Sequence, residues 1–166
     1  MNITETSNKY NVFLIGNNPQ EISLMETDLK KFNEINFIAE VGFDLRRSIN
    51  RVFKTRPNYI LLDDCYPVIQ LKKFIKRIRQ NNKMQHTPIA ILKSSNKHHL
   101  RVDDIQDFFL KDNFSADRLF HAIKNSRKIR RTQIVLYRLN KKRRRQYQHL
   151  KYSIKNLFSG YQPGKS

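Results

Sequence analysis

The sequence has few of the residues that build disulfides, phosphate-binding loops or membrane spans. Its 166 residues include one cysteine, Cys65, which excludes an intramolecular disulfide framework and favours a reducing compartment. Four glycines, at positions 16, 42, 160 and 164, are too few and too scattered for a glycine-rich phosphate loop. The apolar runs are far shorter than a bilayer span, and the polar first ten residues do not resemble a signal peptide. We therefore expect a soluble, cytoplasmic protein without a membrane span.

Acidic residues are missing from the C-terminal part of the chain. Residues 118–166 contain 15 of the 33 Lys and Arg and none of the 14 Asp and Glu. Most of the net charge of +19 therefore lies in this tail. Such asymmetry suggests a basic arm that meets nucleic acid, an acidic protein or an anionic lipid surface. The length predicts one domain, residues 1–126, followed by a basic helical extension, residues 127–166.

Short apolar runs alternate with segments of helical periodicity. Strands are predicted at residues 11–15, 36–41, 59–62, 88–92 and 108–110, and helices at residues 19–32, 44–55, 69–80 and from 116 onward. Residues 93–107 have the weakest pattern and predict only a short or irregular helix. This alternation predicts an α/β fold with a doubly wound five-stranded parallel sheet. The last helix is expected to be long, because no Gly or Pro lies between Ser115 and Gly160.

The stretch from Pro57 to Pro67 contains the third predicted strand, and the candidate site is predicted from it. Four large side chains, at 59–62, precede Asp63, which should emerge at the carboxyl end of a buried strand. Right-handed crossovers bring the carboxyl ends of several strands to one edge, where ligands bind in such folds. The residues expected at this edge are Gly16, Asn17, Asn18, Asp63, Asp64, Lys93 and Lys111.

Three segments give the chain a resemblance to the receiver domains of two-component response regulators, in particular stand-alone chemotaxis-type receivers. Residues 57–67 resemble the phosphoacceptor strand, residues 88–92 the fourth strand and residues 107–111 the fifth strand. The resemblance covers roughly residues 10–127 and implies the flavodoxin-like receiver fold. It also implies that Asp63 matches the phosphoacceptor, Lys111 the lysine of the site and Phe108 the switch aromatic position. For Phe108, core packing is the expected role.

Other positions depart from the pattern of the family. Receivers hold a divalent metal with an acidic pair after the first strand and place a hydroxyl after the fourth strand. This chain has Gly16 and Asn17 at the first place and Lys93 at the second. Mg²⁺ depends on carboxylates, so its binding should be weak. We expect Lys93 to lie near Asp63 together with Lys111 and to replace the metal electrostatically.

These observations predict an atypical receiver, or pseudo-receiver, that is not an enzyme, has no catalytic residues and needs no cofactor. Its expected role is phosphorylation-independent signal transduction by binding a protein partner. A first alternative is a phosphoaccepting receiver in a phosphorelay, which would use Asp63 and Mg²⁺. No set of histidines has the spacing of metal ligands, and no metal site is predicted.

A second alternative lies in the basic tail, which could bind nucleic acid or a cyclic dinucleotide through arginine–phosphate pairing. Apolar residues near a heptad spacing could also pair the helix with a second copy in a homodimer. The candidate anion-binding residues are Arg127, Lys128, Arg130, Arg131, Lys141, Lys142, Arg143, Arg144 and Arg145.

Overall fold

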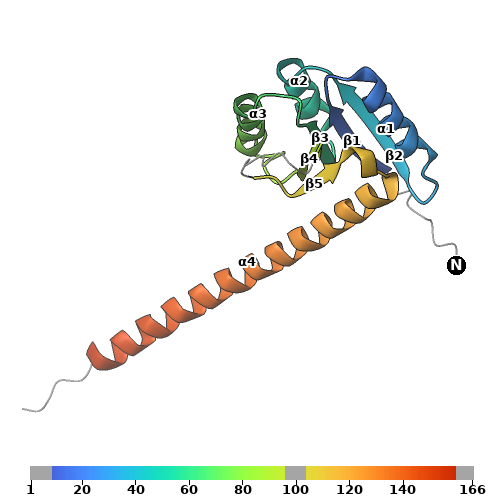
Figure 1. The fold of residues 1–166 in the computed structure, drawn as a ribbon. Helices are drawn as coiled ribbons and strands as arrows, with labels where there is room; N and C mark the ends of the chain where they lie inside the picture. Colours follow the sequence, from blue (N-terminus) through green and yellow to red (C-terminus); the bar gives the residue numbers. More distant parts are fainter. Residues whose placement is uncertain (1–8, 96–103, 160–166) are drawn as a thin grey trace, which may run out of the picture. The chain divides into compact units, whose positions relative to one another are not determined.

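The computed structural model describes residues 9–95 and 104–159. Its five strands form one sheet in the order β2-β1-β3-β4-β5, and every neighbouring pair is parallel (Figure 1). The predicted doubly wound parallel sheet is therefore confirmed. The strands are β1 (Lys9–Ile15), β2 (Asn36–Gly42), β3 (Tyr59–Asp63), β4 (Ile89–Lys93) and β5 (Asp107–Leu110).

Three of the helices begin after a polar residue whose side chain caps the first turn, whereas the third helix begins after Pro67 without a side-chain cap. Asn18 caps the first helix by accepting hydrogen bonds from the backbone N–H groups of Gln20 and Glu21, and Asp44 caps the second by accepting from the N–H of Arg47. The Ser115 hydroxyl accepts from the N–H of Arg118 at the start of the last helix. The helices are α1 (Pro19–Lys31), α2 (Leu45–Thr55), α3 (Val68–Gln80), the 3₁₀ turn η1 (Lys111–Asn113) and α4 (Ala116–Ser159).

Alternation along the strands divides the core into two layers. On β3, Tyr59 and Leu61 pack with α1 and the start of α4, whereas Ile60 and Leu62 pack with α2 and α3. All four side chains are fully buried, as expected for a parallel strand covered on both faces. Figure 1 shows the sheet between α1 on one side and α2 and α3 on the other.

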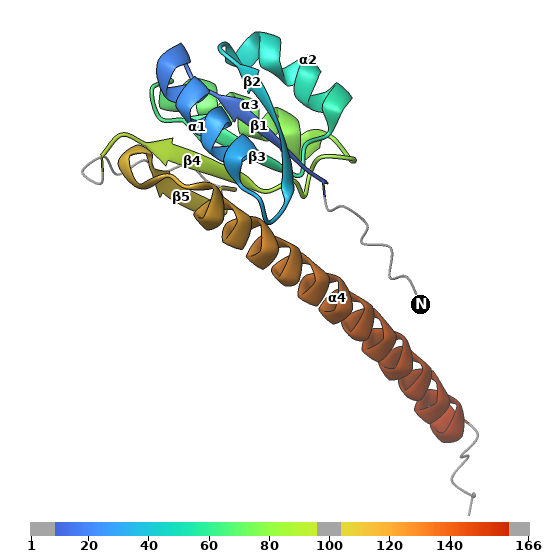
Figure 2. The same cartoon turned by 90° about the vertical axis from the view of Figure 1, so that its right-hand side faces the viewer.

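Two compact units follow one another along the chain, Met1–Ser126 and Arg127–Ser166. The long C-terminal helix predicted from the sequence is confirmed, since α4 runs without interruption through residue 126 to Ser159. Figure 2 shows β4 and β5 side by side, followed by the turn into α4. The predicted short helix before β5 lies largely in residues 96–103, outside the described residues. None of the described helices has the length and apolar content needed to cross a bilayer.

Candidate functional site

The candidate site is centred on Asp63, the last residue of β3. In the order β2-β1-β3-β4-β5, the crossovers leave β1 in opposite directions, so the carboxyl ends of β1 and β3 form the switch point at which ligands bind in such folds. Leu62 pairs with Ile15, which places Asp63 beside Gly16, the first residue after β1. Asp63 is completely buried, although it is a carboxylate. Its charge therefore needs partners supplied by the protein.

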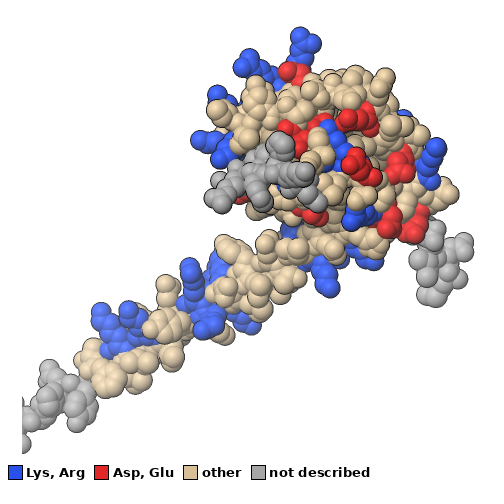
Figure 3. All heavy atoms as spheres, viewed as in Figure 1, with Lys and Arg blue, Asp and Glu red and all other residues tan. Residues whose placement is uncertain are grey.

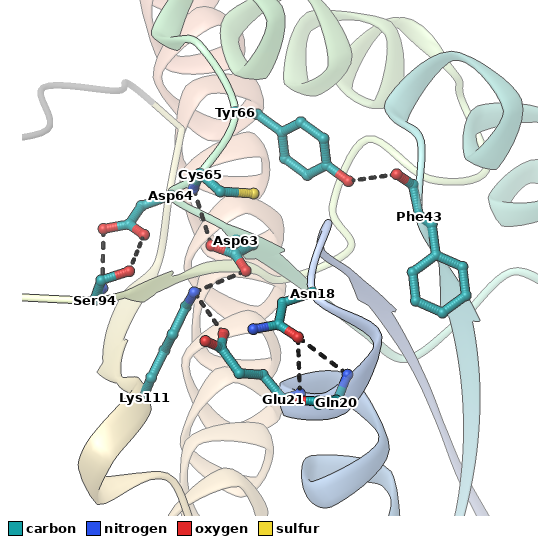
Figure 4. A network of polar contacts seen from close by, with 10 residues as sticks. All are labelled: Asn18, Gln20, Glu21, Phe43, Asp63, Asp64, Cys65, Tyr66, Ser94 and Lys111. Carbon is teal, nitrogen blue, oxygen red and sulfur yellow. Dashed lines mark hydrogen bonds and ion pairs between the residues drawn. The ribbon is translucent and has the colours of Figure 1, made fainter.

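Lys111 supplies the positive charge. Its ammonium Nζ lies 2.9 Å from Oδ2 of Asp63 and 2.9 Å from Oε2 of Glu21 (Figure 4). The other Asp63 oxygen, Oδ1, accepts a hydrogen bond of 2.9 Å from the backbone N–H of Cys65. The contact at Oδ2 is an ion pair without hydrogen-bond geometry, so electrostatic attraction alone compensates this buried oxygen. The ammonium is thus held between one buried and one partly exposed carboxylate.

The pKa of Lys111 reflects this arrangement. Burial by itself favours the neutral amine and lowers the pKa. The hydrogen bond to Glu21, the close contact with Asp63 and the negative charges of both outweigh burial and raise the pKa above its ordinary value. Lys111 therefore stays charged throughout the physiological pH range. Its position is fixed by η1, which begins at Lys111 directly after β5.

Lys93 does not lie where the sequence analysis expected it. Its ammonium lies 5.0 Å from the centroid of the Phe108 ring, and among the described residues the cation paired with Asp63 is Lys111. The reason is strand alternation. Leu61 and Leu92 belong to the layer of α1, so Asp63, two residues after Leu61, faces α1, whereas Lys93, one residue after Leu92, faces the opposite side. The expectation that Lys93 replaces the metal beside Asp63 is wrong.

Phe108 also differs from the expectation. It is 47% exposed and does not pack in the core, where the neighbouring Phe109 is buried instead. Phe108 pairs with Ile91 across β4 and β5, so it shares a sheet face with Lys93. The exposed ring and the ammonium form a cation–π contact.

The remaining predicted positions surround Asp63 but do not all face it. Asp64 accepts from both the backbone N–H (3.0 Å) and the hydroxyl (2.8 Å) of Ser94, which joins the ends of β3 and β4. Asn18 caps α1, as described above, and Asn17 is exposed. Gly16 is buried against Asp63.

Two residues of the site were not predicted as members of it. Glu21 lies three residues after the cap Asn18, which is the position of a capping-box carboxylate, but its carboxylate binds Lys111, 90 residues away. The hydroxyl of Ser94, just after β4, binds Asp64. The sequence does contain a signal that Glu21 belongs to the site. Glu21 lies in the first turn of the helix that follows β1, and this turn is at the same edge of the sheet as Asp63.

The receiver fold implies a divalent metal beside the acceptor aspartate, but the residues present do not fit one. After β1, where carboxylates would be needed, the chain has Gly16 and the exposed amide of Asn17. The carboxylates of Asp63 and Glu21 share the Lys111 ammonium, and that of Asp64 accepts two hydrogen bonds from Ser94. Among the described residues, no group of three or more His, Cys, Asp or Glu could hold a metal. A hard cation bound at Asp63 would have to displace this ammonium and be held by few charged oxygens.

The candidate anion-binding residues of the tail belong to a different unit from this site. The nine residues between Arg127 and Arg145 all lie on α4, and all are exposed. Figure 3 shows Lys and Arg at several places along this helix, and residues 127–159 contain no Asp or Glu.

Comparisons with known proteins support the receiver fold. No protein-family model matches the sequence, and no curated protein matches it. Among solved structures, the chemotaxis response regulator CheY4 of Vibrio cholerae is 17% identical with a TM-score of 0.58, covering 71% of this chain and 98% of that chain. A response regulator from Desulfuromonas acetoxidans is 18% identical with a TM-score of 0.59, covering 72% and 98%.

The N-terminal domain of a response regulator receiver protein from Methanoculleus marisnigri is 18% identical with a TM-score of 0.52, covering 70% of this chain and 94% of that chain. At these identities the likeness establishes the fold. The resemblance to receiver domains predicted from the sequence is confirmed at that level, as a flavodoxin-like domain followed by a long C-terminal helix.

Proposed function

We propose that this protein is a receiver-type module of two-component signalling that works without phosphorylation, acts in the cytoplasm and transmits its signal by binding a protein partner. It is proposed to be a binding module and not an enzyme. The observation that carries this proposal is the Glu21–Lys111–Asp63 arrangement, in which the acceptor carboxylate is buried and already paired with a cation of the protein.

Two further observations support the proposal. Phosphoryl transfer to a carboxylate needs positive charge to neutralise the attacking and transferring oxygens, and a bound metal usually supplies it. The donor set around Asp63 does not fit a metal, for the reasons given above. In addition, Lys93 occupies the place of the expected hydroxyl and faces away from Asp63. The site therefore has the charge balance of a structural ion-pair cluster.

Phosphorylation can be tested directly. The full chain would be incubated with Mg²⁺ and a small phosphodonor such as acetyl phosphate, and its mass would be measured, with Asp63→Asn as the control. We expect no phosphoryl adduct. An adduct on the native chain that is lost in Asp63→Asn would overturn the proposal and establish the phosphoaccepting alternative.

A second candidate function, binding of an anionic partner by the tail, is favoured by the charge of α4. Between residues 127 and 159 the helix carries twelve Lys and Arg and no acidic residue. A cluster of this kind attracts phosphates of nucleic acid or of a cyclic dinucleotide, and arginine can pair with them in a bidentate manner. Large apolar side chains on the same segment, such as Leu136 and Leu150, are exposed and would also allow pairing with a second copy.

The tail function is tested with full-length variants. Replacing Lys141, Lys142, Arg143, Arg144 and Arg145 by Gln should weaken binding of a DNA or RNA oligonucleotide and flatten its salt dependence. Replacing the three arginines by lysine keeps the charge and serves as the control. Binding that is equally tight in the Gln variant would exclude this cluster as the contact. Sedimentation of the native chain tests the homodimer.

A further inference from the structure

A groove between α2 and α3 lies away from Asp63, on the opposite face of the sheet. It has a volume of about 300 Å³ and is lined by two kinds of side chain. Its floor is apolar and its rim is basic. The floor consists of Leu45, Ile49 and Phe74, and the rim contains Arg46, Lys73, Arg77 and the neutral Gln70.

The two helices beside the groove carry one sign of charge. Together α2 and α3 hold nine Lys and Arg and no Asp or Glu. Arg51 pairs with Glu40, and Arg79 binds backbone carbonyls. Among the described residues, no carboxylate forms an ion pair with any of the three rim cations. Figure 3 shows Lys and Arg on the part of the domain where α2 and α3 lie.

The concentration of Lys and Arg on α2 and α3 is not explained by the overall charge of the domain. Residues 1–117 contain all 14 acidic residues of the chain, yet none falls within α2 or α3. Several of those acidic residues pair with cations outside α2 and α3, as Glu26 does with Lys30 within α1 and Glu21 with Lys111. The rim cations raise the local positive potential over an apolar floor, and a partner of opposite charge would be attracted to this face.

The apolar floor of the groove favours a peptide over a phosphate chain as the anionic partner. A phosphate chain would pair with the rim alone. It would leave the floor, where Leu45, Ile49 and Phe74 are 2–5% exposed, and the exposed apolar side chain beside it without a matching contact. A peptide segment can satisfy both, since carboxylates pair with the cations and one apolar side chain covers the floor. Ile69, one helical turn before Lys73, is 69% exposed and extends the apolar surface along α3.

We propose that the α2–α3 groove binds an acidic segment of a partner protein, with an apolar side chain over Leu45, Ile49 and Phe74 and carboxylates beside Arg46, Lys73 and Arg77. The inference rests on the proposed function, because it locates the protein-binding surface of a module that does not use phosphorylation. It locates the binding of the acidic segment on the α2–α3 face of the domain, and this binding involves neither Asp63 nor the tail.

The test uses the full-length chain and a short synthetic helical peptide with leucines on one face and glutamates beside them. Anisotropy of a labelled peptide measures the affinity, and amide chemical shifts locate the contact. We expect binding that shifts residues of α2 and α3. The triple variant R46E/K73E/R77E should weaken it by about tenfold or more, because three charge pairs are lost and reversed.

Matched controls separate the groove from general charge attraction. The variant R47E/K72E/K76E reverses the same number of charges on the same two helices outside the groove lining, and it should change the affinity by less than about threefold. A peptide with serines in place of the leucines should bind much more weakly.

The groove assignment is overturned if the acidic peptide does not bind, if both triple variants lose affinity equally, or if the serine peptide binds as well as the leucine peptide. It is also overturned if an oligonucleotide binds the rim residues more tightly than the peptide. Phosphorylation of Asp63 would contradict the proposed function without moving any of these readouts, so the two failures are distinguishable.

Discussion

A Cβ atom added to Gly16 would lie 3.0 Å from Oδ2 of Asp63 and 2.8 Å from Cδ1 of Ile22. The backbone after β1 therefore approaches the buried carboxylate as closely as a residue without a side chain allows. Gly16→Ala should lower the free energy of unfolding by about 1–3 kcal/mol, because Ile22 is buried and can move only by disturbing the core.

Urea denaturation of the native chain and of Gly16→Ala measures this difference. Asn17→Ala is the control, since the neighbouring side chain is exposed and its removal should change stability by less than about 0.5 kcal/mol. Equal stability of Gly16→Ala and the native chain would show that Ile22 and Asp63 leave room for a side chain at position 16. The same crowding predicts that Gly16→Asp disturbs the site and does not create a strong metal site.

Removing Lys111 should be more harmful than removing Asp63. Lys111→Met leaves the fully buried Asp63 charge without a cation and should cost about 3–5 kcal/mol of stability. Asp63→Asn leaves Lys111 paired with Glu21 and should cost less. Denaturation at neutral pH ranks the two variants. If Asp63→Asn proves the more destabilising, the ammonium is not what compensates the buried carboxylate.

The stability contributed by Lys111 should depend on pH at the alkaline end. Its pKa in the folded state is raised above the ordinary value of 10.5, so the folded state binds the proton more tightly than the unfolded state. The contribution is fully present below that ordinary value and is lost as the pH rises through the raised pKa. The buried Tyr59, whose pKa is also raised, adds to the alkaline loss of stability in every variant. Lys111→Met should therefore show a shallower decline above about pH 10 than the native chain.

Cys65 should react slowly with alkylating reagents. The residue is exposed, but desolvation of its thiol, aided by the nearby charge of Asp63 and opposed by a hydrogen bond from the Asn17 backbone, raises the pKa to about 11. At pH 8 the thiolate fraction is about 100-fold below that of a thiol with the ordinary value of 9.0.

Iodoacetamide modification followed by mass measurement across pH gives the rate profile for Cys65. Asp63→Asn should speed the reaction at pH 8, because it removes a negative charge that disfavours the thiolate. A native rate equal to that of free cysteine would contradict the raised pKa.

Replacing Arg79 by lysine should destabilise the fold. Its guanidinium donates to the carbonyls of Gln85 (3.1 Å), Thr87 (2.8 Å) and Asp104 (2.7 Å), and burial lowers its pKa. A lysine ammonium cannot match this planar geometry, so Arg79→Lys should cost about 1–3 kcal/mol. Arg77→Lys, at an exposed position of the same helix, is the control and should be nearly neutral in thermal denaturation. Equal melting temperatures for the two variants would mean that the three carbonyls are satisfied without Arg79.

The sequence by itself determined the order of the elements and the edge at which Asp63 lies. Apolar runs such as residues 59–62 can be buried only between two layers of helices, and residues such as Asn18 and Asp44 mark helix starts through their own side chains. These are local properties of the chain. The long last helix follows in the same way from the absence of Gly and Pro.

Only the tertiary structure decided which side chains meet. Lys93 and Lys111 both follow strands toward the same edge, but alternation and register direct Lys93 to Phe108 and leave Lys111 with Asp63. Glu21 joins them because α1 packs over the same face of the sheet. The groove between α2 and α3 likewise requires two helices, separate in sequence, to lie side by side. Contacts of this kind depend on how elements distant in the chain are packed, which spacing along the sequence does not specify.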